Sequence, residues 1–227
     1  MNRQEQETLL HRISKRLMLN SDFTDDLGLE HGKSGVIIFF YNYFRFTGLS
    51  VYEDFADELL DEMQNCIKNC NSDFRKSICG IGLCFEYLIH NRFIEAENEV
   101  MEELDTYITK RVDIKNKGMD NGLTGAVYYA ISRSFADNCS LEKEFIANLH
   151  KQLFGLQEND PEINFLKEQL SRIMINSKTF EYPDLLHILL KNVTCTEHSL
   201  YGLPVYSLEN GLTGTGLKII RDITNNG

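Results

Sequence analysis

Gly122-Leu123-Thr124-Gly125, followed at once by the apolar run Ala126-Val127-Tyr128-Tyr129-Ala130-Ile131, is the stretch that decides the fold of this chain. The pattern occurs four times, in a weaker form at its second occurrence: Gly32-Lys33-Ser34-Gly35, Ser77-Ile78-Cys79-Gly80, Gly122-Leu123-Thr124-Gly125 and Gly211-Leu212-Thr213-Gly214. The second and third copies each begin 45 residues after the copy before, and the fourth begins 89 residues after the third. A period of this length indicates repeated supersecondary units.

Two kinds of helix alternate along the chain. Segments such as 3–19, 52–70 and 93–112 carry apolar residues at helical spacing on one side and polar residues, Asp105 among them, on the other. This pattern is typical of surface helices that bury one face. The runs after the glycine motifs are apolar on nearly every side, which favours interior helices, and we expect Ser34, Thr124 and Thr213 to act as their N-caps.

The alternation predicts about five pairs of an outer and an inner helix. The pairs are 3–19 with 33–47, 52–70 with 79–91, 93–112 with 122–136, 141–155 with 161–177, and 183–193 with 211–224. The fourth inner helix lacks the glycine motif and begins at Asp160-Pro161, an N-cap followed by proline. Alternating helices favour an all-α fold of the α/α toroid type over an open solenoid, which would need polar end caps. We expect one domain over residues 1–227.

Charge and cysteine content limit the class of partner and the compartment. The formal net charge of −11 argues against a nucleic-acid backbone or an anionic membrane surface as the main partner. The start, Met1-Asn2-Arg3-Gln4-Glu5-Gln6, lacks the apolar segment of a secretory signal, and no apolar stretch is long enough to span a membrane. With its six cysteines, the chain is therefore expected to be cytoplasmic, with free thiols.

The repeats resemble those of the lanthionine synthetase C-like family. The residues that carry the resemblance are Leu29-Glu30-His31-Gly32-Lys33-Ser34-Gly35-Val36, Ser77-Ile78-Cys79-Gly80-Ile81-Gly82-Leu83, Met119-Asp120-Asn121-Gly122-Leu123-Thr124-Gly125-Ala126 and Leu208-Glu209-Asn210-Gly211-Leu212-Thr213-Gly214. The resemblance covers roughly residues 27–220. It implies a toroid of nested helices, here a short one, with the glycine loops gathered at one mouth.

The resemblance also implies a chemistry. In the family's enzymes a zinc ion at that mouth is held by two cysteines and a histidine, from a Trp-Cys-Tyr-Gly and a Cys-His-Gly segment. The zinc makes the thiol of a substrate peptide a thiolate, which adds to a dehydrated serine or threonine and closes a thioether ring. This chain has neither segment and no tryptophan, and Glu30 precedes His31 where the cysteine would stand. We therefore expect no zinc; if zinc is bound, Cys79, Cys195 and His198 offer the same set of ligand types from other positions.

Residues just before the first glycine of each copy are predicted to surround the mouth. They are Glu30, His31, Arg75, Lys76, Asp120, Asn121, Glu209 and Asn210. The acidic members could bind a hard cation or serve as paired carboxylates, with His31 and Glu30 as the candidate catalytic residues. The alternative is that Asp, Asn and Glu at these positions only cap helix N-termini.

These observations lead to three functional predictions. The favoured prediction is a zinc-less binding or accessory protein of peptide modification, whose partner is a peptide or protein. The second is a zinc-dependent thioether cyclase with displaced ligands. The third is an α/α-barrel enzyme that acts on glycans through carboxylates such as Glu30, Asp120 or Glu209, which would then lie roughly 5–10 Å apart.

Overall fold

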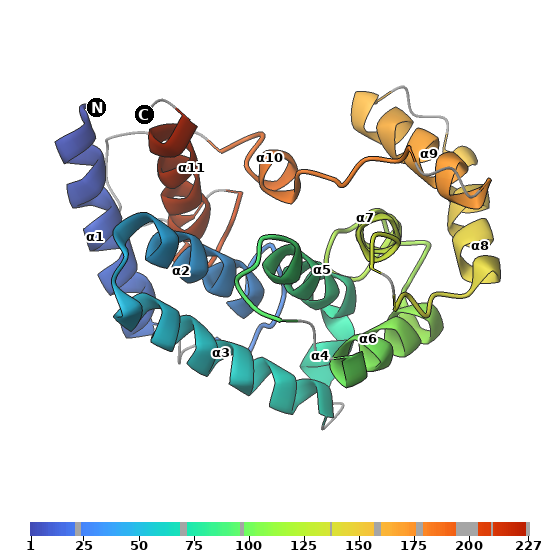
Figure 1. Ribbon diagram of the computed structural model, residues 1–227, viewed down its shortest axis with the longest axis horizontal. Coiled ribbons are helices and arrows are strands. Elements are labelled where there is room, and N and C mark those ends of the chain that lie inside the picture. Colours follow the sequence, from blue (N-terminus) through green and yellow to red (C-terminus); the bar gives the residue numbers. More distant parts are fainter. Residues whose placement is uncertain are drawn as a thin grey trace. The chain divides into compact units, whose positions relative to one another are not determined.

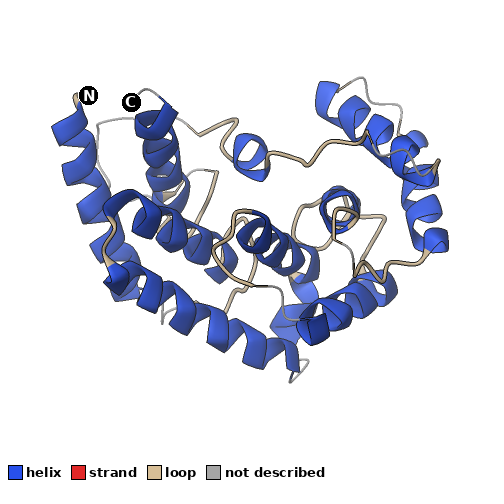
Figure 2. Cartoon of the chain, in the orientation of Figure 1, coloured by secondary structure: helices blue, strands red, loops and turns tan. Residues whose placement is uncertain are grey.

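The computed structural model describes residues 1–20, 24–68, 72–95, 98–136, 138–156, 160–175, 179–193, 204–209 and 211–225. Its helices are α1 (Arg3–Asn20), α2 (Lys33–Thr47), α3 (Ser50–Lys68), α4 (Ser72–Lys76), α5 (Ile78–His90), α6 (Asn98–Arg111), α7 (Leu123–Arg133), α8 (Lys143–Phe154), α9 (Pro161–Met174), α10 (Leu185–Leu189) and α11 (Leu212–Asn225). The described residues form helices and one isolated bridge, Asp113 with Gly122, but no strand (Figure 2). The chain is all-α, as its periodicity predicts.

The chain divides into two compact units. Unit 1 comprises Met1–Phe74 and Leu185–Gly227, and unit 2 comprises Arg75–Asp184. The expectation of a single domain over residues 1–227 stays a prediction.

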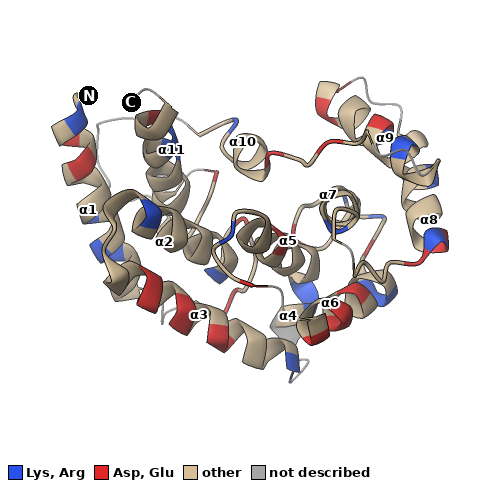
Figure 3. Ribbon diagram, viewed as in Figure 1, with Lys and Arg blue, Asp and Glu red and all other residues tan. Residues whose placement is uncertain are grey.

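Unit 1 brings together the two ends of the sequence. Helix α2 packs against α3 and α11, and α11 also packs against α1, so that the first and last long helices lie side by side (Figure 1). The run from Val36 to Tyr41 on α2 is at most 1% exposed, and α11 buries Leu217 and Ile219. Most acidic residues of α3, whose positions are red on the ribbon in Figure 3, are exposed, whereas its buried residues are apolar and pack against α2.

Unit 2 is built around α5 and α7. Helix α5 packs against α6 and α7, α7 also packs against α8 and α9, and α8 packs against α9. Residues 126–131 of α7 are fully buried, as their apolar sequence predicts. Gly82 of α5 allows this packing, because a Cβ there would lie 2.7 Å from the ring of Tyr129 and 2.9 Å from Ile108.

Four expectations are corrected. The N-caps of α2 and α7 are Gly32 and Gly122, without a side-chain hydrogen bond, instead of Ser34 and Thr124, and α11 likewise begins at Leu212, one residue before Thr213. Helix α9 is amphipathic instead of buried all round, with Leu166, Gln169 and Leu170 as its buried residues. The outer helix predicted over 183–193 is shortened to α10. Asp105, predicted on the polar face of α6, is 2% exposed.

Two expectations are confirmed in detail. Asp160 is the N-cap of α9, where its side chain accepts a hydrogen bond from the Glu162 amide at 2.7 Å, and Pro161 follows at the first helical position. Most predicted helices lie within a few residues of those observed, and α2 has the predicted bounds of 33–47.

Among the described helices, none is long and apolar enough to cross a membrane.

Candidate functional site

The three full copies of the glycine motif form the same loop. The amide after the first glycine donates to a carbonyl seven or eight residues earlier: Lys33 to Asp26 at 2.9 Å, Leu123 to Asn116 at 2.7 Å, and Leu212 to Pro204 at 3.0 Å. The hydroxyls at the third motif position donate backwards as well, Ser34 to the Leu27 carbonyl at 2.6 Å and Thr213 to the Val205 carbonyl at 3.2 Å. These hydroxyls thus fix the preceding loop instead of capping the helix.

Close approach of the backbone explains the second glycine of each copy. A Cβ would lie 2.7 Å from the Leu29 carbonyl oxygen at Gly35, 1.8 Å from that of Met119 at Gly125, and 1.6 Å from that of Leu208 at Gly214. In each copy the carbonyl belongs to the residue six positions earlier. Glycine is therefore required here by the space beside it.

Neighbouring loops join through the backbone of the predicted mouth residues. In unit 1 the Leu208 amide donates to the Glu30 carbonyl at 2.9 Å. In unit 2 the amides of Cys79 and Gly80 donate to the Asp120 carbonyl at 2.8 and 3.1 Å. The weaker second copy thus also takes part in this loop structure, because the first turn of its helix is hydrogen-bonded to the loop of the third copy.

The side chains of the predicted mouth residues differ in exposure. Glu30, Asp120 and Asn121 are half-buried, whereas His31, Arg75, Lys76 and Glu209 are exposed. Unit 1 holds Glu30, His31 and Glu209 on its two joined loops, and unit 2 holds the other four. Asn210 lies outside the described residues. The structure thus brings the set together in two groups, and its ring of acidic residues stays a prediction.

Two polar groups at these loops make few contacts. The imidazole of His31 forms no hydrogen bond or ion pair with the described residues, and its role as a catalytic residue stays a prediction. Asn121 Oδ1 is buried and accepts no hydrogen bond within the described part of the chain. A buried acceptor without a donor is costly, and a ligand N–H would relieve that cost.

The family model of the lanthionine synthetase C-like protein matches residues 24–180, which include the first three glycine motifs. The chain belongs to the lanthionine synthetase C-like family. The fold of that family is an α/α toroid, and the all-α structure agrees with it. No curated protein and no solved structure matches the chain.

Of the three candidate zinc ligands, Cys79 is the one that lies within the described residues. This thiol is fully buried, and burial, followed by the nearby charge of Asp120, raises its pKa well above the ordinary value. Zinc binds the thiolate and would itself favour that form, so Cys79 as a zinc ligand stays a prediction. Cys195 and His198, the other two candidates, lie outside the described residues. Within the described residues no three His, Cys, Asp or Glu side chains are placed to hold a metal.

The largest group of buried charges in unit 2 lies away from the glycine motifs. It consists of Glu86, Asp105 and Arg133, all at most 5% exposed. Sequence reasoning missed it as a cluster, although Glu86 was a visible signal, being the one charged residue in the run from Leu83 to Ile89. Its Arg133 and Asp105 are 28 residues apart, so the pairing could not be read from local spacing.

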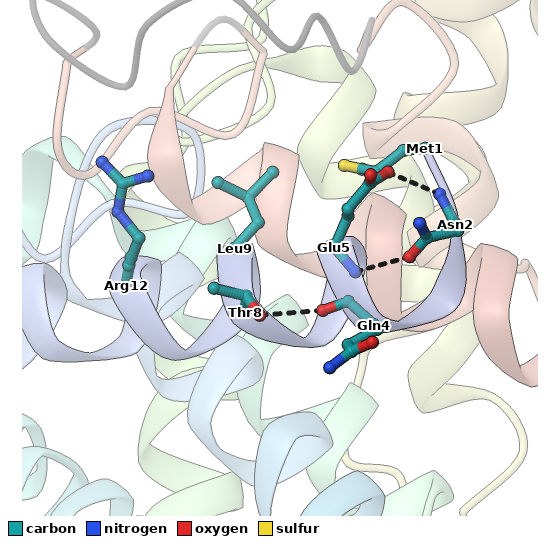
Figure 4. A pocket seen from close by; sticks show the side chains of 7 residues that line it. All are labelled: Met1, Asn2, Gln4, Glu5, Thr8, Leu9 and Arg12. Atoms are coloured by element: carbon teal, nitrogen blue, oxygen red, sulfur yellow. Dashed lines mark hydrogen bonds between the residues drawn. The ribbon is translucent and has the colours of Figure 1, made fainter.

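A hollow of about 550 Å³ along α1 offers no comparable chemistry (Figure 4). Its polar contacts stay within the helix: the Asn2 amide donates to Glu5 Oε2 at 2.8 Å, and the Glu5 amide donates to Asn2 Oδ1 at 2.9 Å. This reciprocal pair is a capping box, which explains the start of α1 and leaves the hollow as one open helix face.

Proposed function

We propose that this member of the lanthionine synthetase C-like family binds a peptide or protein partner and serves peptide modification as an accessory protein. One observation carries the proposal. The amide after the first glycine makes the same hydrogen bond in all three full copies, while the residues beside the loops are Glu30-His31, Asp120-Asn121 and Glu209-Asn210, with Glu30 where the family's cysteine would stand. A scaffold kept with different side chains at its loops favours binding over zinc chemistry.

Asn121 gives this proposal a specific contact. Its buried Oδ1 can accept the backbone N–H of a bound peptide, while the loop that carries it is held by the Leu123 and Gly125 amides. A neutral hydrogen bond of this kind contributes about 1 kcal/mol, which corresponds to about a fivefold change in the dissociation constant.

A peptide that contains one cysteine and one dehydroalanine can separate binding from ring closure. The full chain, purified after growth with zinc, is analysed for metal content and then mixed with the fluorescent peptide. We expect well below one zinc per chain, an anisotropy change that reports binding, and no loss of free peptide thiol, since ring closure consumes the thiol. Asn121→Ala should weaken binding about fivefold, whereas Asn148→Ala, at an exposed position of α8, should not.

Absence of binding would contradict the proposal. One zinc per chain together with consumption of the peptide thiol would instead support a cyclase with displaced ligands. Cys195→Ser and His198→Ala would then identify those ligands by loss of the metal.

A further inference from the structure

The buried cluster of unit 2 contains two carboxylates for one cation. Arg133 Nε donates to both oxygens of Asp105, at 3.1 and 3.0 Å. Its Nη1 and Nη2 donate to Oδ1 and the carbonyl of Asn138, each at 2.9 Å. Asp105 also accepts from Tyr129 at 2.8 Å and from the Ser140 hydroxyl at 2.6 Å. The charge of Arg133 is thus matched, and each of its nitrogens already donates a hydrogen bond.

Glu86 on α5 is the second acid, and it has no such partners. It is 5% exposed, and its Oε1 lies 3.8 Å from Arg133 Nε, beyond hydrogen-bond distance. Burial raises the pKa of Glu86 to about 7, because the attraction of Arg133 only partly offsets it and Asp105 adds repulsion.

A short segment holds Glu86 in place from outside. Residues 179–184, called the strap here, bind α9 through the Thr179 carbonyl, which accepts from Arg172 at 2.6 Å, and through the Glu181 amide, which donates to Gln169 at 2.7 Å. The strap reaches α5 at Tyr182, whose hydroxyl donates to the Glu86 carbonyl at 3.1 Å. The Tyr182 ring stacks on His90 with ring centroids 3.4 Å apart.

We propose that Glu86 is a pH sensor built into unit 2, which carries a proton in the closed form and whose ionisation loosens the strap. A charged Glu86 needs water, since its own neighbours do not solvate it. The strap contacts α5 through one hydroxyl and one ring stack, and its Phe180 and Tyr182 rings also meet the Phe135 ring edge-on, with centroids 4.4 and 5.4 Å apart. This inference does not depend on the proposed function.

The other titratable groups around Glu86 act differently. They are Asp105 from α6, Tyr129 and Arg133 from α7, Cys139 from the following loop, Tyr182 from the strap, and His90 on α5 itself. Burial raises the pKa of both tyrosines and of Cys139, so these groups stay neutral through neutral pH. Burial lowers the pKa of His90, so the stabilisation of the closed form by neutral His90 grows as pH rises.

The stabilisation of the closed form by Glu86 changes with pH in the opposite direction to that by His90. The pKa of Glu86 is raised from the ordinary value of 4.5, which a solvated carboxyl in the open form would have, to about 7 in the closed form. The stabilisation of the closed form is therefore complete below pH 4.5 and is lost as pH rises to about 7, after which it levels off. One proton changes the opening equilibrium by at most about tenfold per pH unit in that window.

Chymotrypsin cleavage after Phe180 can report opening of the strap in the full chain. Its rate at pH 5, 6, 7 and 8 is divided by the rate for a free peptide of the strap sequence at the same pH, which removes the protease's own pH dependence. We expect the ratio to rise up to about tenfold per pH unit from pH 5 to 7 and then to level off. Glu86→Gln, an uncharged isostere, should stay at the wild-type level of pH 5, while Glu102→Gln, exposed on α6, should follow wild type.

Three outcomes would overturn the proposal: an unchanged pH profile in Glu86→Gln, a ratio that falls as pH rises, or a Glu86→Gln protein that is more open than wild type at every pH. Carboxyl carbon-13 NMR of wild type with labelled glutamate gives an answer that needs no folded variant. One glutamate carboxyl should titrate near pH 7, and titration of every glutamate below pH 5.5 would refute the sensor.

Discussion

Adding a single methyl group at Gly125 would prevent the loop before α7 from adopting its observed conformation. The carbonyl of Met119 occupies the place where a side chain would begin, and Cys79 Cβ lies 3.0 Å away on the other side. Neither backbone carbonyl nor buried thiol can move at little cost. Packing is thus sufficient to explain the second glycines of the motif.

Gly125→Ala is therefore expected to destabilise the protein by about 1–3 kcal/mol or more, because the loop must shift to admit the methyl group. Gly155→Ala is the matched control, since its Cβ would meet no atom closer than 3.3 Å and its backbone is helical. Urea unfolding followed by circular dichroism measures both. Equal stability of the two variants would show that the third loop is not held as described.

At the same scale, the motif predicted the position of each loop but not the role of its hydroxyls. Ser34 and Thr213 look like N-caps in the sequence, because serine and threonine commonly cap helices. In the structure their hydroxyls bond to carbonyls seven and eight residues earlier, and the chain turns into the helix at the glycine instead. Such a bond depends on how the preceding loop folds back, which local propensity does not encode.

Among the elements, helices were predicted well where their apolar pattern was strong. The inner runs of α2, α5 and α7 are buried on all sides, as their composition implies. α10 is shorter than predicted because residues 190–193 turn through tighter bonds, such as Val193 to the Leu190 carbonyl at 3.2 Å. The place of α9 in the repeat predicts a buried inner helix, but Glu162, Lys167 and Arg172 give it a polar face.

Asp105 links α6 to α7 through its hydrogen bonds with Tyr129 and Arg133. Asp105→Ala leaves Arg133 buried without the carboxylate that accepts its hydrogen bonds, and Glu86 stays 3.8 Å away; loss of such a buried partner typically costs about 3–5 kcal/mol. Glu99→Ala, at an exposed position of the same helix, should change stability by less than about 0.5 kcal/mol. Denaturant midpoints of the two variants at pH 7 give the comparison, and a similar small loss for both would contradict the buried pair.

On the scale of the whole molecule, unit 1 needs both ends of the sequence. Helix α11 packs against α1 and α2, and Gly216 lets Phe39 approach so closely that a Cβ would lie 2.4 Å from its ring. The core of this unit is therefore completed by residues almost two hundred positions apart. The family resemblance predicted the nested helices, whereas the residues at the mouth could be placed only loop by loop.

Truncation after Glu209 should consequently unfold unit 1 and spare unit 2. Without α11, the apolar faces of α1 and α2 lose their shared partner and become accessible to protease. Limited proteolysis with mass spectrometry should then leave a resistant fragment close to residues 75–184. Survival of residues 1–74 in the truncated chain would refute the dependence on α11.

The contact of α11 with α1 also has a consequence for synthesis on the ribosome. Unit 2 is one continuous stretch, so all of its residues are available as soon as position 184 has left the exit tunnel. The core of unit 1 must wait until residues 212–225 have emerged as well, and α1 and α2 spend that time without α11. Residues 1–74 thus leave the ribosome before unit 2 but complete their core after it, with the apolar faces of α1 and α2 uncovered in between.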